Sequence, residues 1–356
     1  MGDTDWPKDE ATWGNVRDAA NDAFFLSKVF GMFPYGGDLN LNLKLLSYSL
    51  FLVLATVGLG AYNLIQVNNG MKDAFVGRVE FLTLSLSVFA GFVTSVTTGR
   101  KLKDLLLEYE RARSGLHPLG LSKVYDTKDV KLAACCSLAL LTTAGLADLI
   151  MTVTLKGPCS NYIAWSVFFY LGWAMQDCSL RQFTTILHYL NDDFAGLKRY
   201  MKDTNWSLDL SKVETVTSAH DSLSKFCVKL NSFYSVQLFF ILKNNIVILI
   251  ISAFLLERAN VLVELAGIPF IVTGTIRSLL YIFQLWHVCS SCQTVSNEAN
   301  DFKLELYEVA KNDYKNGLPH NFEQKYFKIV TEYCYALELG LRNEEDAHED
   351  SEETED

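Results

Sequence analysis

Two kinds of signal are missing from the sequence, and their absence excludes two classes of function. No strong basic run with interleaved aromatic residues occurs, so we expect no nucleic-acid partner. There is also no HExxH or GxSxG motif and no phosphate-binding glycine loop, and the six histidines are scattered. His220-Asp221 has no paired nucleophile at a recognisable spacing. We therefore expect no enzyme activity and no cofactor.

Signals for secretion and for covalent or metal cross-links are equally scarce. Met1 is followed by an acidic, polar stretch, and the first long apolar segment begins only near Leu45, which does not fit a cleaved signal peptide. Most of the eight cysteines fall inside apolar segments or on the side assigned below to the cytosol, so we expect no disulfide framework. Cys289 and Cys292 form a CxxC, but no second CxxC or histidine pair completes a zinc site, and we expect no metal.

Charge is scarce as well, whereas apolar residues are abundant. Only 20% of the 356 residues are charged, against 50% that are hydrophobic and 13% that are aromatic. The net charge is -10, and many of the acidic residues lie in two tails, Asp3 to Asp22 and Glu344 to Asp356. This distribution is typical of a membrane protein rather than of a soluble acidic one.

Six apolar segments are long enough to cross a bilayer as helices. A helix needs about 20 apolar residues to cross roughly 30 Å of hydrocarbon, because no backbone polar group can stay unpaired in lipid. The predicted spans are Leu45 to Ile65, Ala74 to Thr97, Leu132 to Leu155, Tyr162 to Leu190, Phe233 to Leu256 and Asn260 to Val288. The predicted fold class is therefore all-α, a polytopic membrane helical bundle with six transmembrane helices.

The distribution of lysine and arginine among the loops predicts the orientation. Positive residues resist translocation, so loops that are rich in them stay in the cytosol. Two long loops are basic: one carries Arg100, Lys101, Lys103, Arg111, Arg113, Lys123 and Lys128, the other Lys198, Arg199, Lys202, Lys212, Lys225 and Lys229. The three short loops carry only Lys72, Lys156 and Arg258. We therefore expect the long loops and both termini in the cytosol.

Charged segments outside the spans also show helical periodicity. Apolar residues recur among charges in Lys101 to Gly115, Val213 to Leu230, Val295 to Val309 and Asn321 to Leu339, which we interpret as cytosolic helices. The chain then divides into a cytosolic N-terminal segment (1–44), a six-span bundle with cytosolic helical loops (45–288), cytosolic anchor helices (289–340) and an acidic, disordered tail (341–356).

Two polar stretches carry a resemblance to a known family. The first is Ser218-Ala219-His220-Asp221-Ser222-Leu223 followed by Lys229-Leu230-Asn231-Ser232-Phe233, just before the fifth span. The second runs from Cys289 to Val309, after the sixth span. Together with the architecture over roughly Phe25 to Leu339, they resemble the insect gustatory and odorant receptor superfamily, and its gustatory branch in particular.

The resemblance implies a ligand-gated, non-selective cation channel of the plasma membrane, assembled from four related subunits and opened by tastants or odorants. In that family the last span lines the pore and carries a Thr-Tyr dipeptide with a Gln-Phe pair several residues later. Here the chain reads Gly340-Leu341-Arg342-Asn343 at the corresponding place, and an acidic segment follows. We expect either a truncated form or a six-span product without its own pore helix, and we favour the first.

Aromatic and charged residues near the outer ends of the spans are the candidate ligand-binding residues. A mostly apolar pocket between helices is the usual small-molecule site, and the family's pocket also lies in the outer half of the bundle. The candidates are Tyr62, Glu80, Phe81, Asp148, Tyr162, Trp165, Phe169 and Glu264. For the aromatic residues among them, the alternative interpretation is an interfacial belt.

Charged residues within the spans form a second candidate group, because charge is costly in lipid. Asp177 and Arg181 are one turn apart and can pair with each other. Lys243, Asn244 and Arg277 are expected at comparable, inner depths. One hypothesis is that Asp177 bridges to Lys243 or Arg277 and holds one gating state; the alternative is a structural polar cluster near the cytosolic interface.

The leading interpretation is a taste receptor subunit. A membrane transporter is the principal alternative, although no motif repeated between the spans indicates the internal repeats that transporters often show. A non-conducting modifier of full-length receptor subunits is the third.

Overall fold

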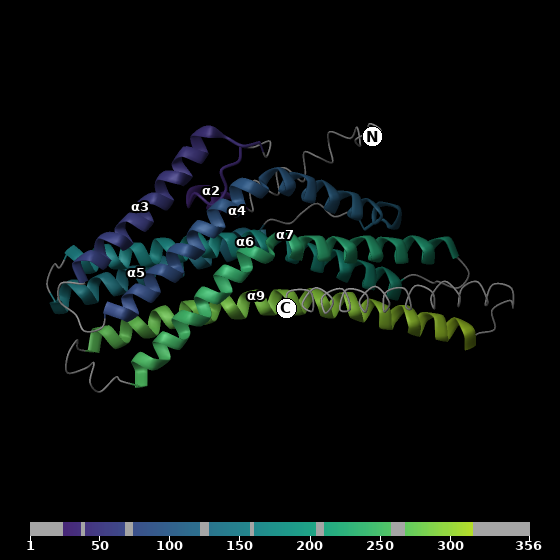
Figure 1. Ribbon diagram of the computed structural model, residues 1–356. Coiled ribbons are helices and arrows are strands. Elements are labelled where there is room, and N and C mark those ends of the chain that lie inside the picture. Colours follow the sequence, from purple (N-terminus) through teal and green to yellow (C-terminus); the bar gives the residue numbers. More distant parts are fainter. Residues whose placement is uncertain are drawn as a thin grey trace, which may run out of the picture. The chain divides into compact units, whose positions relative to one another are not determined.

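The computed structural model describes residues 24–36, 40–67, 74–121, 128–156, 160–203, 210–257 and 268–315. Long helices account for most of them, namely α3 (Leu43–Val67), α4 (Ala74–Ser114), α5 (Lys128–Lys156), α6 (Ser160–Asp203), α7 (Leu210–Glu257) and α9 (Ile268–Lys315) (Figure 1). The other named elements are the short helix α2 (Phe25–Val29), the 3-10 helix η1 (His117–Leu119) and an isolated bridge between Tyr35 and Leu41. The predicted all-α class is confirmed for these residues.

Three of the long helices join an apolar half and a charged half without a break. α4 has 41 residues, and α7 and α9 have 48 each. The helical continuations predicted at 101–115, 213–230 and 295–309 lie on these three helices, except that residue 115 follows the end of α4. The predicted helix at 321–339 and the acidic tail lie outside the described residues.

The helices contribute to two compact units. The first comprises Met1–Glu108, Val124–Leu187 and Val228–Cys292, and the second comprises Tyr109–Lys123, His188–Cys227 and Gln293–Asp356. In the described part of the chain, α4, α6, α7 and α9 each give residues to both units. The units are therefore assembled from interleaved segments, whereas the predicted domains are consecutive blocks of sequence.

Three helical segments among the described residues are long and apolar enough to cross a membrane. They are Leu43–Tyr62, Arg78–Thr97 and Lys212–Phe254. A helix of 43 residues is about 64 Å long, roughly twice the thickness of the hydrocarbon core. Only part of the third segment can lie in lipid, and its apolar second half, which begins near Phe233, fits best.

Helix α6 is buried along most of its length in the first unit. From Phe168 to Leu187 every residue except Leu171 is buried, and this stretch includes the polar Gln176 and Gln182. A helix that is covered by other helices presents little surface to lipid, so polar residues on it can pair with neighbouring helices. This arrangement accounts for the many polar residues in the predicted fourth span, which lower its hydropathy.

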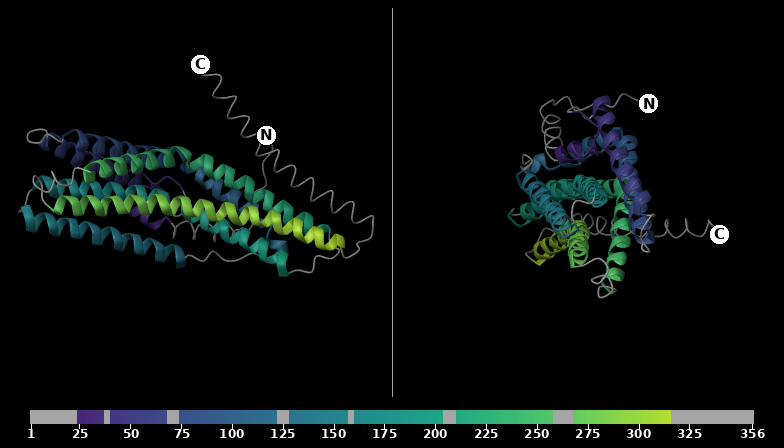
Figure 2. Two further views of the ribbon diagram at one scale, coloured as in Figure 1. Left: turned by 90° about the horizontal axis from the view of Figure 1, so that it is seen from below. Right: turned by 90° about the vertical axis from the view of Figure 1, so that its left-hand side faces the viewer.

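Large apolar side chains of the other helices face outward. Leu50, Phe51, Leu54, Phe239, Ile246, Ile250 and Trp286 are all exposed. Apolar surface on this scale is unfavourable in water, and in lipid it is the expected exterior of a helical bundle. Within the first unit, α5 and α9 each run beside the first half of α6, as Figure 2 shows and as the contacts described below confirm.

The chain before α3 packs into the first unit. Phe24, Met32, Phe33 and Tyr35 are each at most 3% exposed. The Met32 carbonyl oxygen accepts hydrogen bonds from Ser95 Oγ at 2.9 Å and from Gln182 Nε2 at 3.3 Å. The Tyr35 hydroxyl donates to the Ser95 carbonyl oxygen at 2.6 Å. The segment 24–36, called the N-terminal segment below, is thus held by side chains of α4 and α6.

Two glycines of α3 allow a direct test of the packing. A Cβ atom at Gly60 would lie 2.5 Å from Phe81 Cδ2 and 2.7 Å from Phe168 Cε2, whereas at Gly58 nothing lies within 4 Å. Gly60→Ala should therefore destabilise the protein by about 1–3 kcal/mol, because two packed rings must move. Gly58→Ala is the matched control and should leave the melting temperature of the purified protein unchanged or slightly higher. Equal melting temperatures for the two variants would contradict this packing.

Candidate functional site

Three charged side chains from three helices meet inside the first unit. Arg277 of α9 pairs with Asp148 of α5, Nη2 to Oδ2 at 3.1 Å, and with Glu80 of α4, Nη1 to Oε1 at 3.8 Å. The Asp148 side chain is fully buried, and those of Arg277 and Glu80 are 13% and 14% exposed. We call Glu80, Asp148 and Arg277 the charged cluster.

Side chains of α6 complete the surroundings of the charged cluster. Ser166 donates a hydrogen bond from Oγ to Asp148 Oδ2 at 3.0 Å. The guanidinium carbon of Arg277 lies 4.2 Å from the centroid of the Phe169 ring and 5.9 Å from that of Tyr170. Such cation–π contacts are strongest where water is excluded. The cation is therefore held by two carboxylates and two aromatic rings, and the carboxylates outnumber it.

The partners of Arg277 differ from the prediction that placed it at the same depth as Lys243 and Asn244. Arg277 was expected level with Lys243 and near Asp177, but its ion pairs are with Glu80 and Asp148. Arg277 lies about 14 Å from the first described residue of α9, in the first half of the described helix.

The other residues of that group have different partners. Arg181 Nε donates to Asp177 Oδ2 at 2.7 Å, which is the i, i+4 pairing that the sequence offered. Lys243 is exposed, and its Nζ atom lies 6.0 Å from the Phe239 ring centroid. Asn244 is 1% exposed and donates from Nδ2 to Gln176 Oε1 at 3.3 Å. The cation that Asp177 pairs with is therefore Arg181 of its own helix.

A layer of buried amides occupies the interior of the same unit. Gln176 donates from Nε2 to Ser87 Oγ at 2.8 Å, and Asn245 donates from Nδ2 to Gln284 Oε1 at 3.1 Å. With Asn244, these side chains connect α4, α6, α7 and α9. We call Gln176, Asn244, Asn245 and Gln284 the amide layer.

Several buried polar atoms in and beside the amide layer have no hydrogen-bond partner in the described structure. They are Asn244 Oδ1, Asn245 Oδ1, Gln284 Nε2, the Tyr281 hydroxyl and Trp173 Nε1. Buried polar groups are nearly always paired, and leaving one unpaired costs about 1–3 kcal/mol. The set contains donors and acceptors together, which is the chemistry that water or a neutral, hydrogen-bonding small molecule would satisfy.

Sequence reasoning missed Tyr281 and Gln284, although a signal for them exists. Arg277, Tyr281 and Gln284 follow one another at spacings of four and three residues, so they share one face of α9. Polar residues at that spacing in an apolar helix indicate a buried polar stripe.

The predicted ligand-binding residues are only partly brought together. Glu80, Asp148 and Phe169 surround Arg277, while Phe81 and Trp165 pack on Phe168, with ring centroids 5.7 and 5.4 Å apart. Tyr62 is 48% exposed. The side chain of Tyr162 and all of Glu264 lie outside the described residues.

The second unit has its own buried polar contacts, almost entirely outside the predicted spans. Asp193 of α6 accepts a hydrogen bond from the Tyr109 hydroxyl at 2.6 Å and one from Arg113 Nε at 3.2 Å. Burial raises the pKa of the Asp193 carboxyl, and the Arg113 guanidinium opposes that rise. These contacts tie the end of α4 to α6.

His220 lies in the interior of the second unit. Its ring stacks on Phe302 with centroids 4.3 Å apart, and its Nε2 atom lies 3.0 Å from the Ala299 carbonyl oxygen. A carbonyl oxygen can only accept, so Nε2 carries the hydrogen, and Nδ1 faces the Ser224 hydroxyl at 3.4 Å. Burial lowers the pKa of His220 to about 4. The imidazole is therefore neutral at physiological pH and joins α7 to α9.

Comparison with known proteins places these residues in a family. A family model described as "7tm Chemosensory receptor" matches residues 23–317, well over half of the chain. The matched range contains the charged cluster, the amide layer and His220. No curated protein matches the chain.

Proposed function

The chain belongs to the 7tm chemosensory receptor family, and on that premise we propose that it is a taste receptor subunit that binds a small-molecule tastant. Binding would open a non-selective cation channel in the plasma membrane. The subunit would assemble with three copies of itself or with related subunits into a tetramer. The membrane character of the family and the apolar exterior of the helices support this setting.

The observation that carries the proposal is the charged cluster with the amide layer beside it. Burying Glu80, Asp148 and Arg277 is expensive in a membrane protein, and ionisable residues at such depth are functional-site candidates. Aromatic rings and hydrogen-bonding atoms without partners surround the cluster, a combination common in small-molecule sites. We assign the tastant to this region, where its polar groups would pair with the unpartnered amides.

The proposed topology puts this region near the outer face of the membrane. With six spans and a cytosolic N-terminus, α4 and α9 would begin on the outer side and α5 would end there. Glu80 lies near the beginning of α4, Arg277 lies in the first part of α9 and Asp148 lies near the end of α5. The basic loop that joins α4 to α5, and that would stay in the cytosol, lies at the opposite ends of these two helices.

A pair of tyrosines tests the proposed site. Tyr281→Phe removes a buried hydroxyl without a partner, whereas Tyr62→Phe changes an exposed side chain. If the Tyr281 hydroxyl binds the tastant, its loss should raise the half-maximal tastant concentration about 3- to 10-fold, the value of one hydrogen bond, with Tyr62→Phe unchanged. Whole-cell recording against a tastant panel, with the chain alone and with a related receptor subunit, gives the readout.

Three outcomes would contradict the proposal. Equal sensitivity of wild type and Tyr281→Phe would remove the tyrosine from the site. An altered current only in cells that also express a relative would make the chain a modifier of other subunits. Substrate uptake without current would make it a transporter.

A further inference from the structure

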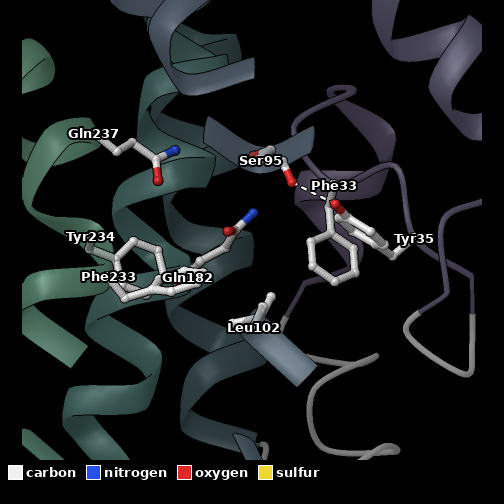
Figure 3. A pocket seen from close by; sticks show the side chains of 8 residues that line it. All are labelled: Phe33, Tyr35, Ser95, Leu102, Gln182, Phe233, Tyr234 and Gln237. Carbon is white, nitrogen blue, oxygen red and sulfur yellow. Dashed lines mark hydrogen bonds between the residues drawn. The ribbon is translucent and has the colours of Figure 1, made fainter. Parts of the chain in front are cut away.

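A small cavity lies in the first unit at the N-terminal segment, apart from the charged cluster. Its walls come from four parts of the chain: Phe33 and Tyr35 of the N-terminal segment, Ser95 of α4, Gln182 of α6, and Tyr234 and Gln237 of α7 (Figure 3). All six are buried. None of them was among the candidate site residues.

Two polar atoms of the side chains that line this cavity have no partner in the described structure. They are Gln237 Nε2 and the Tyr234 hydroxyl, on side chains that are 3% and 1% exposed. Figure 3 shows the amide ends of Gln182 and Gln237 directed toward the same space. The Gln182 nitrogen already donates to the Met32 carbonyl oxygen, which leaves the Gln182 oxygen as an acceptor.

We propose that this cavity binds one water molecule that links α7 to α6 beside the N-terminal segment. Its space of about 10 Å³ matches the room that one water needs. The lining side chains are all uncharged, so an ion would find no counter-charge. The water would accept from Gln237 Nε2, bond to the Tyr234 hydroxyl and donate to the Gln182 oxygen, within the two to four partners of buried waters.

The position of this water gives it a role in docking the N-terminal segment. Gln182 bonds to the Met32 carbonyl oxygen, and Ser95 bonds to the same oxygen. A water that orients the Gln182 amide therefore supports the contact that holds the N-terminal segment against α4 and α6. This inference does not depend on the proposed tastant or channel.

The sign of a stability change separates a wet cavity from a dry one. If the cavity is dry, Gln237→Leu and Tyr234→Phe each remove an unpaired buried group and raise the melting temperature. If the cavity holds water, each substitution removes a hydrogen-bond partner of that water and should lower the melting temperature by about 2 °C. The double variant should then lose less than the sum, because the water is lost only once.

Two further measurements keep the proposal testable if a variant folds poorly. A high-resolution map of the unmodified protein should show density within hydrogen-bond distance of Gln237 Nε2 and the Tyr234 hydroxyl. Hydrogen exchange across residues 24–36 should be faster in Gln237→Leu than in wild type, while Gln293→Leu, at an exposed position of α9, serves as the control. Absent density, a raised melting temperature or unchanged exchange would each overturn the proposal.

Discussion

Replacing Arg277 by methionine should destabilise the protein by about 3–5 kcal/mol, the cost of leaving a buried charge without its partner. The fully buried Asp148 carboxylate and Glu80 would both lose their cation, although the Ser166 hydroxyl would still donate to Asp148. Methionine keeps most of the length and contact area of the arginine stem, so the loss of charge dominates over the loss of packing. We expect a large fall in the yield of monodisperse protein, measured by fluorescence-detected size-exclusion chromatography, and a lower melting temperature.

A charge rescue separates electrostatics from packing in this experiment. Combining Arg277→Met with Asp148→Asn removes the cation together with the more deeply buried of its two carboxylates, and should restore most of the lost yield. Arg277→Lys keeps the charge but not the planar group above Phe169. Its yield of monodisperse protein should therefore lie between those of wild type and Arg277→Met. A normal yield for Arg277→Met alone, or no recovery in the double variant, would show that the charged cluster does not hold α4, α5 and α9 together.

Acid should weaken the second unit through His220. The folded-state pKa of about 4 lies below the ordinary value of 6.5, so between these values the unfolded chain binds the proton and the folded chain does not. Stability is therefore complete above pH 6.5 and falls as the pH drops toward 4. The gap between the two pKa values corresponds to about 3 kcal/mol. The melting temperature, followed from pH 7.5 to pH 4.5, should show this decline.

A variant without a titrating side chain isolates the histidine from other groups. Asp193, whose pKa burial raises, acts in the opposite direction as the pH falls, and Lys303 and Asp221 also act on His220. His220→Gln keeps a donor for the Ala299 carbonyl oxygen and cannot gain a proton. It should start less stable at pH 7.5, because the stacking on Phe302 is lost, and decline less steeply than wild type. If the melting temperatures of wild type and His220→Gln fell equally steeply with pH, the acid sensitivity could not be assigned to His220.

The hydrophobic pattern of the sequence was sufficient to predict the long helices, but not which of their residues meet inside the bundle. The long helices agree with the predicted segments, including the charged continuations of α4, α7 and α9, because helical periodicity is a local property of sequence. Arg277 pairs with Glu80 and Asp148 of other helices instead of Asp177, because contacts between helices are set by their packing and not by a local pattern. The i, i+4 spacing of Asp177 and Arg181 was local, and the structure contains that pair.

The sequence by itself determined that the chain is an all-helical protein of apolar segments, and it singled out Glu80, Asp148 and Phe169 as candidates. Composition and periodicity settle such features because each depends on neighbours along the chain. Only the tertiary structure decided that Arg277 joins those three residues, that the amides of α6, α7 and α9 form one layer, and that the N-terminal segment borders a cavity with Gln237. These contacts join residues tens to more than two hundred positions apart, and the packing of helices, which no local pattern encodes, brings them together.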